Sequence, residues 1–208
     1  MEWLEVTEGS RGLQALVGRA VGLDQLAAAR FQQVAGGGVD VFVTTPFDCI
    51  AARRVAGRAS RDGAAVSAAE LLAALQAGTR DIGPARDASW PGALPPAQGF
   101  TARDTVPVAA ARSLADEGRA LARQFSGPAG PPKSLLDGIV LTADADSADP
   151  VKIPMRMIFT CTALGLIPGF EAPEHIPRHL RVSTAGRWVR LDAPFGSVYR
   201  NAGLGLLV

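Results

Sequence analysis

The chain has 208 residues, of which 48% are hydrophobic and 20% are charged, and its formal net charge is +1. This length and balance predict a globular protein of one or two domains and exclude a disordered or fibrous chain. So small a net charge gives no overall attraction to nucleic acid or to an anionic membrane. No apolar run reaches the roughly 20 residues that cross a bilayer, and no secretory signal is visible, so we expect a cytoplasmic protein without membrane contact.

Both cysteines, Cys49 and Cys161, lie in apolar runs far apart in the sequence. Two lone cysteines form neither a disulfide framework nor a CxxC redox motif. We therefore expect both side chains to be small buried hydrophobic groups.

The first half of the chain combines helix and strand patterns. Apolar residues recur at helical spacing over 11–21, behind Ser10 as a candidate N-cap. Ser67 and Glu70 form an S-x-x-E capping box, which predicts a helix over 68–77. Between these helices, period-two alternation rich in β-branched residues predicts a three-stranded meander over 28–34, 39–44 and 49–55.

A Pro/Gly-rich stretch, residues 79–103, interrupts the pattern with four prolines and three glycines. Such density makes regular structure unfavourable and is typical of a linker or a functional loop. We place the domain boundary here, between an N-terminal α+β domain over 1–78 and a C-terminal α+β domain over 104–208.

The second half begins with a predicted helix over 105–124, capped by Thr105 and with Pro107 in its first turn. An apolar helix is expected to start at Pro154. Strands are predicted on both sides of the acidic loop 144–149, and a second meander follows, giving the ranges 139–142, 151–153, 180–184, 187–192 and 197–200. The predicted fold class is α+β, with two antiparallel β-meanders, each packed with helices.

Common catalytic signatures are missing from the sequence. It contains no G-x-S-x-G elbow, no G-x-x-x-x-G-K-[ST] phosphate loop, no H-E-x-x-H motif and no paired CxxC. The catalytic residues, if any, stay unknown, and no cofactor is predicted.

Two arrangements resemble metal sites. The only histidines, His175 and His179, could lie on one helical face with Glu174 as a third ligand. Pro177 disfavours a continuous helix there and Arg178 would repel a cation, so a solvated loop is the preferred interpretation.

The acidic loop is the second such arrangement. Asp144, Asp146 and Asp149 resemble the start of a calcium loop, but the positions that need Gly and Glu hold Asp149 and Met155. We predict a solvated connection and no metal.

The C-terminal residues 151–208 carry seven basic and three acidic side chains, a net charge of +4. If Ala185-Gly186 forms a two-residue turn, then the core-facing pairs are Val182 with Val189 and Leu180 with Leu191.

On the other face, this register places Arg181 opposite Arg190 and Ser183 opposite Trp188. Like charges directly opposite each other destabilise a sheet, so we expect an anionic partner, either an acidic protein surface or nucleic acid. A three-residue turn with a bulge at Gly186 would instead turn Trp188 into the core. Acidic residues of the fold could also neutralise the two arginines, leaving an ordinary packed meander.

The segment from Thr184 to Tyr199 has the sequence TAGRWVRLDAPFGSVY. It resembles a stretch shared by a family of uncharacterised actinobacterial proteins. The predominance of arginine over lysine, 19 against 2, agrees with such a source. The resemblance implies no activity, cofactor or catalytic residue.

The preferred hypothesis is a non-catalytic binding or regulatory module that uses the basic C-terminal meander. The alternative is an enzyme that clamps a small anionic substrate with arginines and uses Asp192 or Asp48 as its base. A third hypothesis is a homo-oligomer formed through the apolar tail, residues 203–208.

Overall fold

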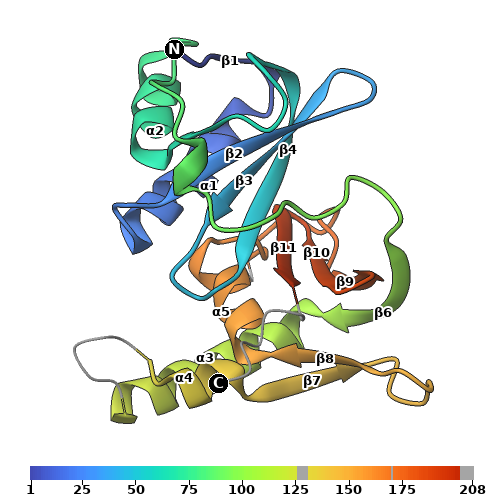
Figure 1. Cartoon of the computed structure of the whole chain (residues 1–208). Helices are drawn as coiled ribbons and strands as arrows, with labels where there is room; N and C mark the ends of the chain where they lie inside the picture. The colour runs from blue at the N-terminus through green and yellow to red at the C-terminus, as the bar shows by residue number, and fades with distance from the viewer. Residues whose placement is uncertain (126–130, 170, 202–208) are drawn as a thin grey trace. The chain divides into compact units, whose positions relative to one another are not determined.

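The structure, a computed structural model of the whole chain, describes residues 1–125, 131–169 and 171–201. The chain divides into two compact units, residues 1–98 and 99–208. Each unit combines helices with antiparallel sheet, which confirms the predicted α+β fold class (Figure 1). None of the helices in the described ranges is long and apolar enough to cross a membrane.

The first unit contains the predicted meander and two strands that extend it. Its strands are β1 (Leu4–Glu8), β2 (Ala28–Val34), β3 (Gly38–Thr44), β4 (Ile50–Ala59) and β5 (Ala65–Ser67). Its helices are α1 (Ser10–Leu23), α2 (Ala68–Ala77) and the single 3-10 turn η1 (Asp87–Ser89). Hydrogen bonds join the strands in the order β5-β2-β3-β4, and β1 pairs with the last residues of β4.

The two helices of this unit form as predicted, but their N-termini differ in detail. Ser67 is the N-cap residue of α2, yet its side chain makes no capping hydrogen bond. The predicted capping box is wrong because Glu70 accepts a hydrogen bond from Arg86 Nη2, 3.0 Å away, instead of turning back to the cap. Helix α1 is capped by Gly9, and Ser10 is its first helical residue.

The core of the first unit lies between one face of the sheet and the two helices. Both helices pack against each other, and α1 contacts β3 and β4 while α2 contacts β2 and β5. The side chains that meet there are fully buried: Leu13, Leu16, Phe31, Val41, Val43 and Leu71. Burying each large side chain stabilises the unit by about 1.5–3 kcal/mol.

The Pro/Gly-rich stretch up to residue 98 shields part of the opposite face of this sheet. Backbone hydrogen bonds tie the stretch to β1 and β5, and Figure 1 shows it crossing the strands. Trp90 is buried, and the guanidinium of Arg30 lies 6.0 Å from the centre of its ring. Because Arg30 pairs with Phe42 and so shares its face, Trp90 shields the side of the sheet on which Phe42 is buried.

Asp87 joins this stretch to the sheet. Its Oδ1 accepts a hydrogen bond from the Ala65 N–H at 2.8 Å, and its Oδ2 lies 2.5 Å from Arg61 Nη2. The Ala65 N–H, and secondarily Arg61, hold the pKa of Asp87 below the ordinary value of 3.8. A depressed pKa contributes stability above the unfolded pKa and loses it as the pH falls through the folded pKa.

We therefore expect Asp87→Asn to be less stable than the unchanged chain at neutral pH, with a difference that narrows as the pH falls below the ordinary pKa of 3.8. Urea unfolding near pH 7 and at successively lower pH values down to about 2 measures this narrowing. The control is Asp146→Asn, whose side chain is exposed. A constant difference between Asp87→Asn and the unchanged chain at all of these pH values would contradict the assignment.

The second unit has a four-stranded sheet and a separate hairpin. Its strands are β6 (Thr101–Pro107), β7 (Ile139–Ala143), β8 (Val151–Pro154), β9 (His179–Ala185), β10 (Trp188–Ala193) and β11 (Gly196–Asn201). Its helices are α3 (Val108–Phe125), α4 (Lys133–Asp137) and α5 (Met155–Ala163). The sheet order is β11-β10-β9-β6, and β7 pairs with β8. The predicted second meander is therefore β9-β10-β11.

The predicted start of the helix at 105 is wrong. Residues 105–107 belong to β6, where Thr105 pairs with Arg181 and Val106 with Leu180. The helix begins only after Pro107, which is the last residue of the strand. Hydrogen bonding to β9, more than 70 positions later, outweighs the local helical pattern. Such a distant partner leaves no trace in the local sequence.

Helix α5 is the centre of the second core. It contacts α3, α4 and β11, and its residues from Met155 to Cys161 are all buried. Cys161 is completely buried and Cys49 is 3% exposed in its own unit, which confirms the prediction for both cysteines. The apolar tail, residues 203–208, lies outside the described residues.

Candidate binding site

Alternation along β9, β10 and β11 separates an apolar face from a polar one. Leu180, Val182 and Leu191 are buried on the face that packs with the helices. The opposite face we call the Arg190 face, and its members are Arg181, Ser183, Trp188, Arg190, Asp192, Ser197 and Tyr199. The four residues singled out from the sequence, Arg181, Ser183, Trp188 and Arg190, thus share one face.

The predicted register between β9 and β10 is wrong by two residues, because each residue of β10 faces the β9 residue two positions later than predicted. Arg190 lies opposite Ser183, and Arg181 lies opposite Asp192. The like-charge pair that the sequence suggested does not exist, because each arginine faces a hydroxyl or carboxylate side chain. Trp188 pairs with Ala185 and is half-buried on the Arg190 face.

The turn chemistry explains this difference. The two central residues of the turn are Gly186 and Arg187, and Gly186 has φ 55°. A two-residue hairpin needs positive φ at its first central position, which glycine adopts without steric cost. A turn over Ala185-Gly186 would put that demand on alanine, so the hairpin shifts by one residue at the turn and keeps the same faces.

The guanidinium of Arg190 is fixed by three neighbours. Its Nε lies 3.1 Å from Ser183 Oγ and 3.0 Å from Asp192 Oδ2. Its Cζ lies 4.2 Å from the centre of the Phe100 ring, which is the geometry of a cation–π contact. The side chain is 26% exposed, and Nη1 and Nη2 make no hydrogen bond to the described residues. One edge of the group is therefore held and the other edge is open.

The carboxylate of Asp192 accepts contacts from two side chains of the same cluster. Its Oδ1 accepts a hydrogen bond from Ser197 Oγ at 2.6 Å, while Oδ2 pairs with Arg190. Arg181, next to Asp192 across the ladder, is exposed and forms no ion pair within the part of the chain that the structure describes. The face therefore carries two cations for one carboxylate.

Aromatic rings complete the cluster. Phe100 and Tyr199 meet edge to face, with their ring centres 6.0 Å apart and their planes at 71°. Tyr199 is buried and Trp188 is half-buried on the same face. Sequence reasoning missed Phe100 because it placed that residue in the Pro/Gly-rich stretch, and no local pattern links it to strands more than 80 positions later.

The two arrangements that resembled metal sites are built differently from metal sites. His175 and His179 are both exposed, and no helix spans them. Within residues 1–125, 131–169 and 171–201, no group of three or more His, Cys, Asp or Glu side chains could hold a metal ion.

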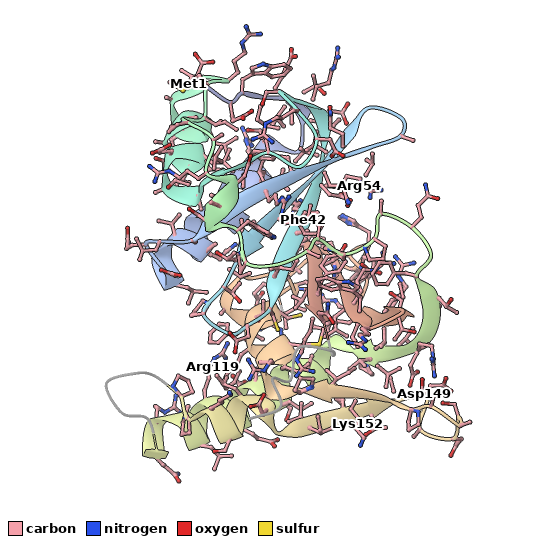
Figure 2. The ribbon with its side chains drawn as sticks, in the orientation of Figure 1. Met1, Phe42, Arg54, Arg119, Asp149 and Lys152 are labelled. Carbon is pink, nitrogen blue, oxygen red and sulfur yellow. The ribbon has the colours of Figure 1, made fainter. Side chains whose placement is uncertain are left out.

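The side chain of Arg103, a residue of β6, contacts the acidic loop between β7 and β8. Its Nε lies 3.0 Å from Asp144 Oδ2, and its Nη2 donates to Ser147 Oγ at 3.3 Å and to the Asp149 carbonyl at 2.5 Å. Figure 2 shows Asp149 at the far end of the β7–β8 hairpin. The positive charge that pairs with this acidic loop is thus supplied by an arginine of the same chain.

Neither candidate base has the surroundings of a catalytic group. Asp192 already accepts an ion pair and a hydroxyl hydrogen bond on the Arg190 face. Asp48 is exposed in a turn of the first unit, with φ 52°. The geometry of the cluster suits recognition of an anion more directly than proton transfer.

Two family descriptions divide the chain in the same order as its two units. Residues 3–92 match "Domain of unknown function (DUF8010)", and residues 95–205 match "Domain of unknown function (DUF8185)". The second match spans more than half of the chain. The chain belongs to the DUF8185 family. In this protein, therefore, the Arg190 face lies within the DUF8185 match. No curated protein matches the chain by sequence.

Solved structures of bacterial sliding clamps share the fold of this DUF8185 protein. The C. crescentus β sliding clamp is 13% identical with a TM-score of 0.58 and aligns with 100% of this chain and 66% of its own. A Bartonella birtlesii sliding clamp, bound to griselimycin, is 13% identical with a TM-score of 0.55 over 100% and 67%. A DNA polymerase sliding clamp from Pseudomonas aeruginosa is 14% identical with a TM-score of 0.55 over 97% and 63%. The chain therefore spans about two thirds of these clamps, and the likeness is one of fold.

Proposed function

We propose that this protein is a non-catalytic binding module whose Arg190 face docks on an acidic protein surface. The observation that carries the proposal is the state of the Arg190 side chain. Three contacts fix one edge and one face of its guanidinium, while Nη1 and Nη2 have no hydrogen-bond partner among the described residues. A pre-oriented arginine loses less side-chain entropy on binding a carboxylate, and paired N–H donors match the two carboxylate oxygens.

The composition of the face favours a protein partner. Tryptophan and arginine are enriched at the energetic centres of protein interfaces, and this face has Trp188 and Arg190 on successive same-side positions of β10. A nucleic-acid surface relies on many phosphate contacts, commonly six to ten in number. Here only two arginines, Arg181 and Arg190, lie on the face, and Arg190 already pairs with the carboxylate of Asp192, so the face has far fewer cations than that number of phosphate contacts requires.

Nucleic acid is the second candidate, because the solved structures with this fold include DNA polymerase sliding clamps. The DNA and acidic-protein candidates differ in the anion that the Arg190 face accepts, so they can be separated by the choice of probe.

Fluorescence anisotropy with labelled poly-L-glutamate and with a labelled single-stranded DNA tests the proposal. We expect poly-L-glutamate to bind at about 50 mM salt and more weakly at about 200 mM, because exposed charges are screened. Arg181→Ala/Arg190→Ala should weaken this binding by about tenfold or more. The matched control, Arg123→Ala/Lys152→Ala, removes the same charge from exposed positions on α3 and β8.

Equal weakening in both double variants would mean non-specific charge attraction and would contradict the proposal, as would no binding of poly-L-glutamate. Binding of DNA alone, lost in Arg181→Ala/Arg190→Ala, would replace the acidic protein surface by nucleic acid.

A further inference from the structure

Three side chains of the Arg190 face follow one another at the spacing of an extended chain. Trp188 and Arg190 are two positions apart on β10, so they lie on the same side of the strand. The next position on that side is Asp192, and Arg181 lies beside it across the ladder. The ring of Trp188 and the cations of Arg190 and Arg181 therefore lie in that order along the sheet.

The distances between these groups are those of a strand. A strand rises about 3.4 Å per residue, so side chains on one face repeat about every 7 Å. An extended peptide laid along β10 has the same repeat. Its alternate side chains can each meet one of the three groups, whereas side chains on one face of a helical peptide recur about every 5.4 Å and fall out of register over three groups.

The chemistry of each group defines what it accepts. The half-buried indole of Trp188 offers a flat apolar surface. The open Nη1–Nη2 edge of Arg190 suits a carboxylate that binds with both oxygens. Arg181 is exposed and, among the described residues, has no ion-pair partner, so it is available to a second carboxylate.

We propose that the Arg190 face binds an extended acidic segment of a partner protein, in which a large apolar residue and two acidic residues alternate with other residues. This inference rests on the proposed function and specifies its ligand. The apolar side chain lies on Trp188, the nearer carboxylate binds Arg190, and the farther carboxylate binds Arg181.

Charge complementarity favours an acidic segment over an uncharged one as the ligand of the Arg190 face. The face has two arginines to one carboxylate, and that carboxylate is already shared between Arg190 and the Ser197 hydroxyl. Phe100 and Ser183 keep the guanidinium in place before the ligand arrives. Phe100 and Ser183 are positioning residues, and only Arg181, Trp188 and Arg190 contact the peptide.

Labelled peptides of equal composition test the spacing. The alternating peptides are Ser-Phe-Ser-Glu-Ser-Glu-Ser and its reverse, since the segment can run in either direction along β10. The block peptide is Ser-Ser-Phe-Glu-Glu-Ser-Ser. We expect the better alternating peptide to bind at least about tenfold more tightly than the block peptide, measured by anisotropy on the full chain.

The variants assign the contacts. Trp188→Ala should weaken the alternating peptide by about tenfold and leave a version with Ala in place of Phe unchanged, while Trp188→Phe should retain most of the affinity. Arg187→Ala, an exposed cation in the turn beside the face, is the matched control and should change binding by less than about twofold.

The inference and the proposed function fail in different ways. If the block and alternating peptides bind equally, and both are weakened by Arg181→Ala/Arg190→Ala, the proposed function stands and the alternating segment is overturned. If no peptide and no poly-L-glutamate binds while the variants remain folded by circular dichroism, both are overturned.

Discussion

Replacing Gly57 with alanine is expected to lower the free energy of unfolding by about 4 kcal/mol, which combines backbone strain with a steric clash. Gly57 has φ 151°, a conformation that residues with a side chain rarely adopt. A Cβ atom there would lie 2.0 Å from the carbonyl oxygen of Glu5 on the neighbouring strand β1. Because the obstacle is backbone, the clash can be relieved only by moving β1 away from β4.

Urea unfolding followed by far-UV circular dichroism measures this loss. Gly22→Ala is the matched control, because no atom lies within 4 Å of an added Cβ and the position is in α1. In a helix, alanine is more favourable than glycine by up to about 1 kcal/mol, so the control should be equal to or more stable than the unchanged chain. Similar stability in the Gly57 and Gly22 variants would show that β1 does not approach β4 so closely.

Removing the carboxylate of Asp137 is expected to cost about 3 kcal/mol, because it takes an ion-pair partner from a buried charge. Arg156 lies on α5 and is 3% exposed, and its Nη2 donates to Asp137 Oδ1. The guanidinium cannot reach bulk water without disturbing the core of the second unit. Asp137→Ala should therefore destabilise this unit far more than the exposure of Asp137 itself, 43%, would indicate.

The double variant Asp137→Ala/Arg156→Met separates the charge from the packing. Methionine fills a similar volume without a charge, so the double variant should recover more than half of the loss. The control pair is Arg119 with Asp116 on α3, where Figure 2 labels Arg119. Both of these side chains are exposed, and Asp116→Ala should change the unfolding free energy by less than about 1 kcal/mol. If Asp137→Ala behaves like Asp116→Ala, the buried charge does not depend on its carboxylate.

Periodicity in the sequence located many of the regular elements. The alternation in 28–34 and 39–44 matches β2 and β3, and the apolar spacing in 68–77 matches α2 residue for residue. The same alternation separated Arg181 and Arg190 from the core-facing Val182 and Leu191. These features were accessible because period two and period 3.6 are set by neighbours within a few residues.

Elements whose stability depends on distant partners were not predicted. Strand β1 is a short edge strand that pairs with residues about 50 positions later, and its own residues alternate only weakly. The capping box predicted at Ser67 does not form because Glu70 accepts a hydrogen bond from Arg86, which lies in the Pro/Gly-rich stretch. In both cases the deciding hydrogen bond comes from another part of the fold, which no local pattern records.

In the candidate site, too, some features follow from the local sequence and others depend on distant parts of the fold. By itself, the sequence determined that Arg181 and Ser183 lie on one side of their strand and that Trp188 and Arg190 lie on one side of theirs, because side-chain alternation depends only on the strand they occupy. Only the tertiary structure decided that the two pairs share one face, which of these side chains meet and what orients them. The turn at Gly186 set the register, and folding brought Phe100 onto the guanidinium of Arg190 from outside the meander. A register depends on turn geometry and a ring contact on the path of a distant segment, so neither is encoded in the local period of the strands.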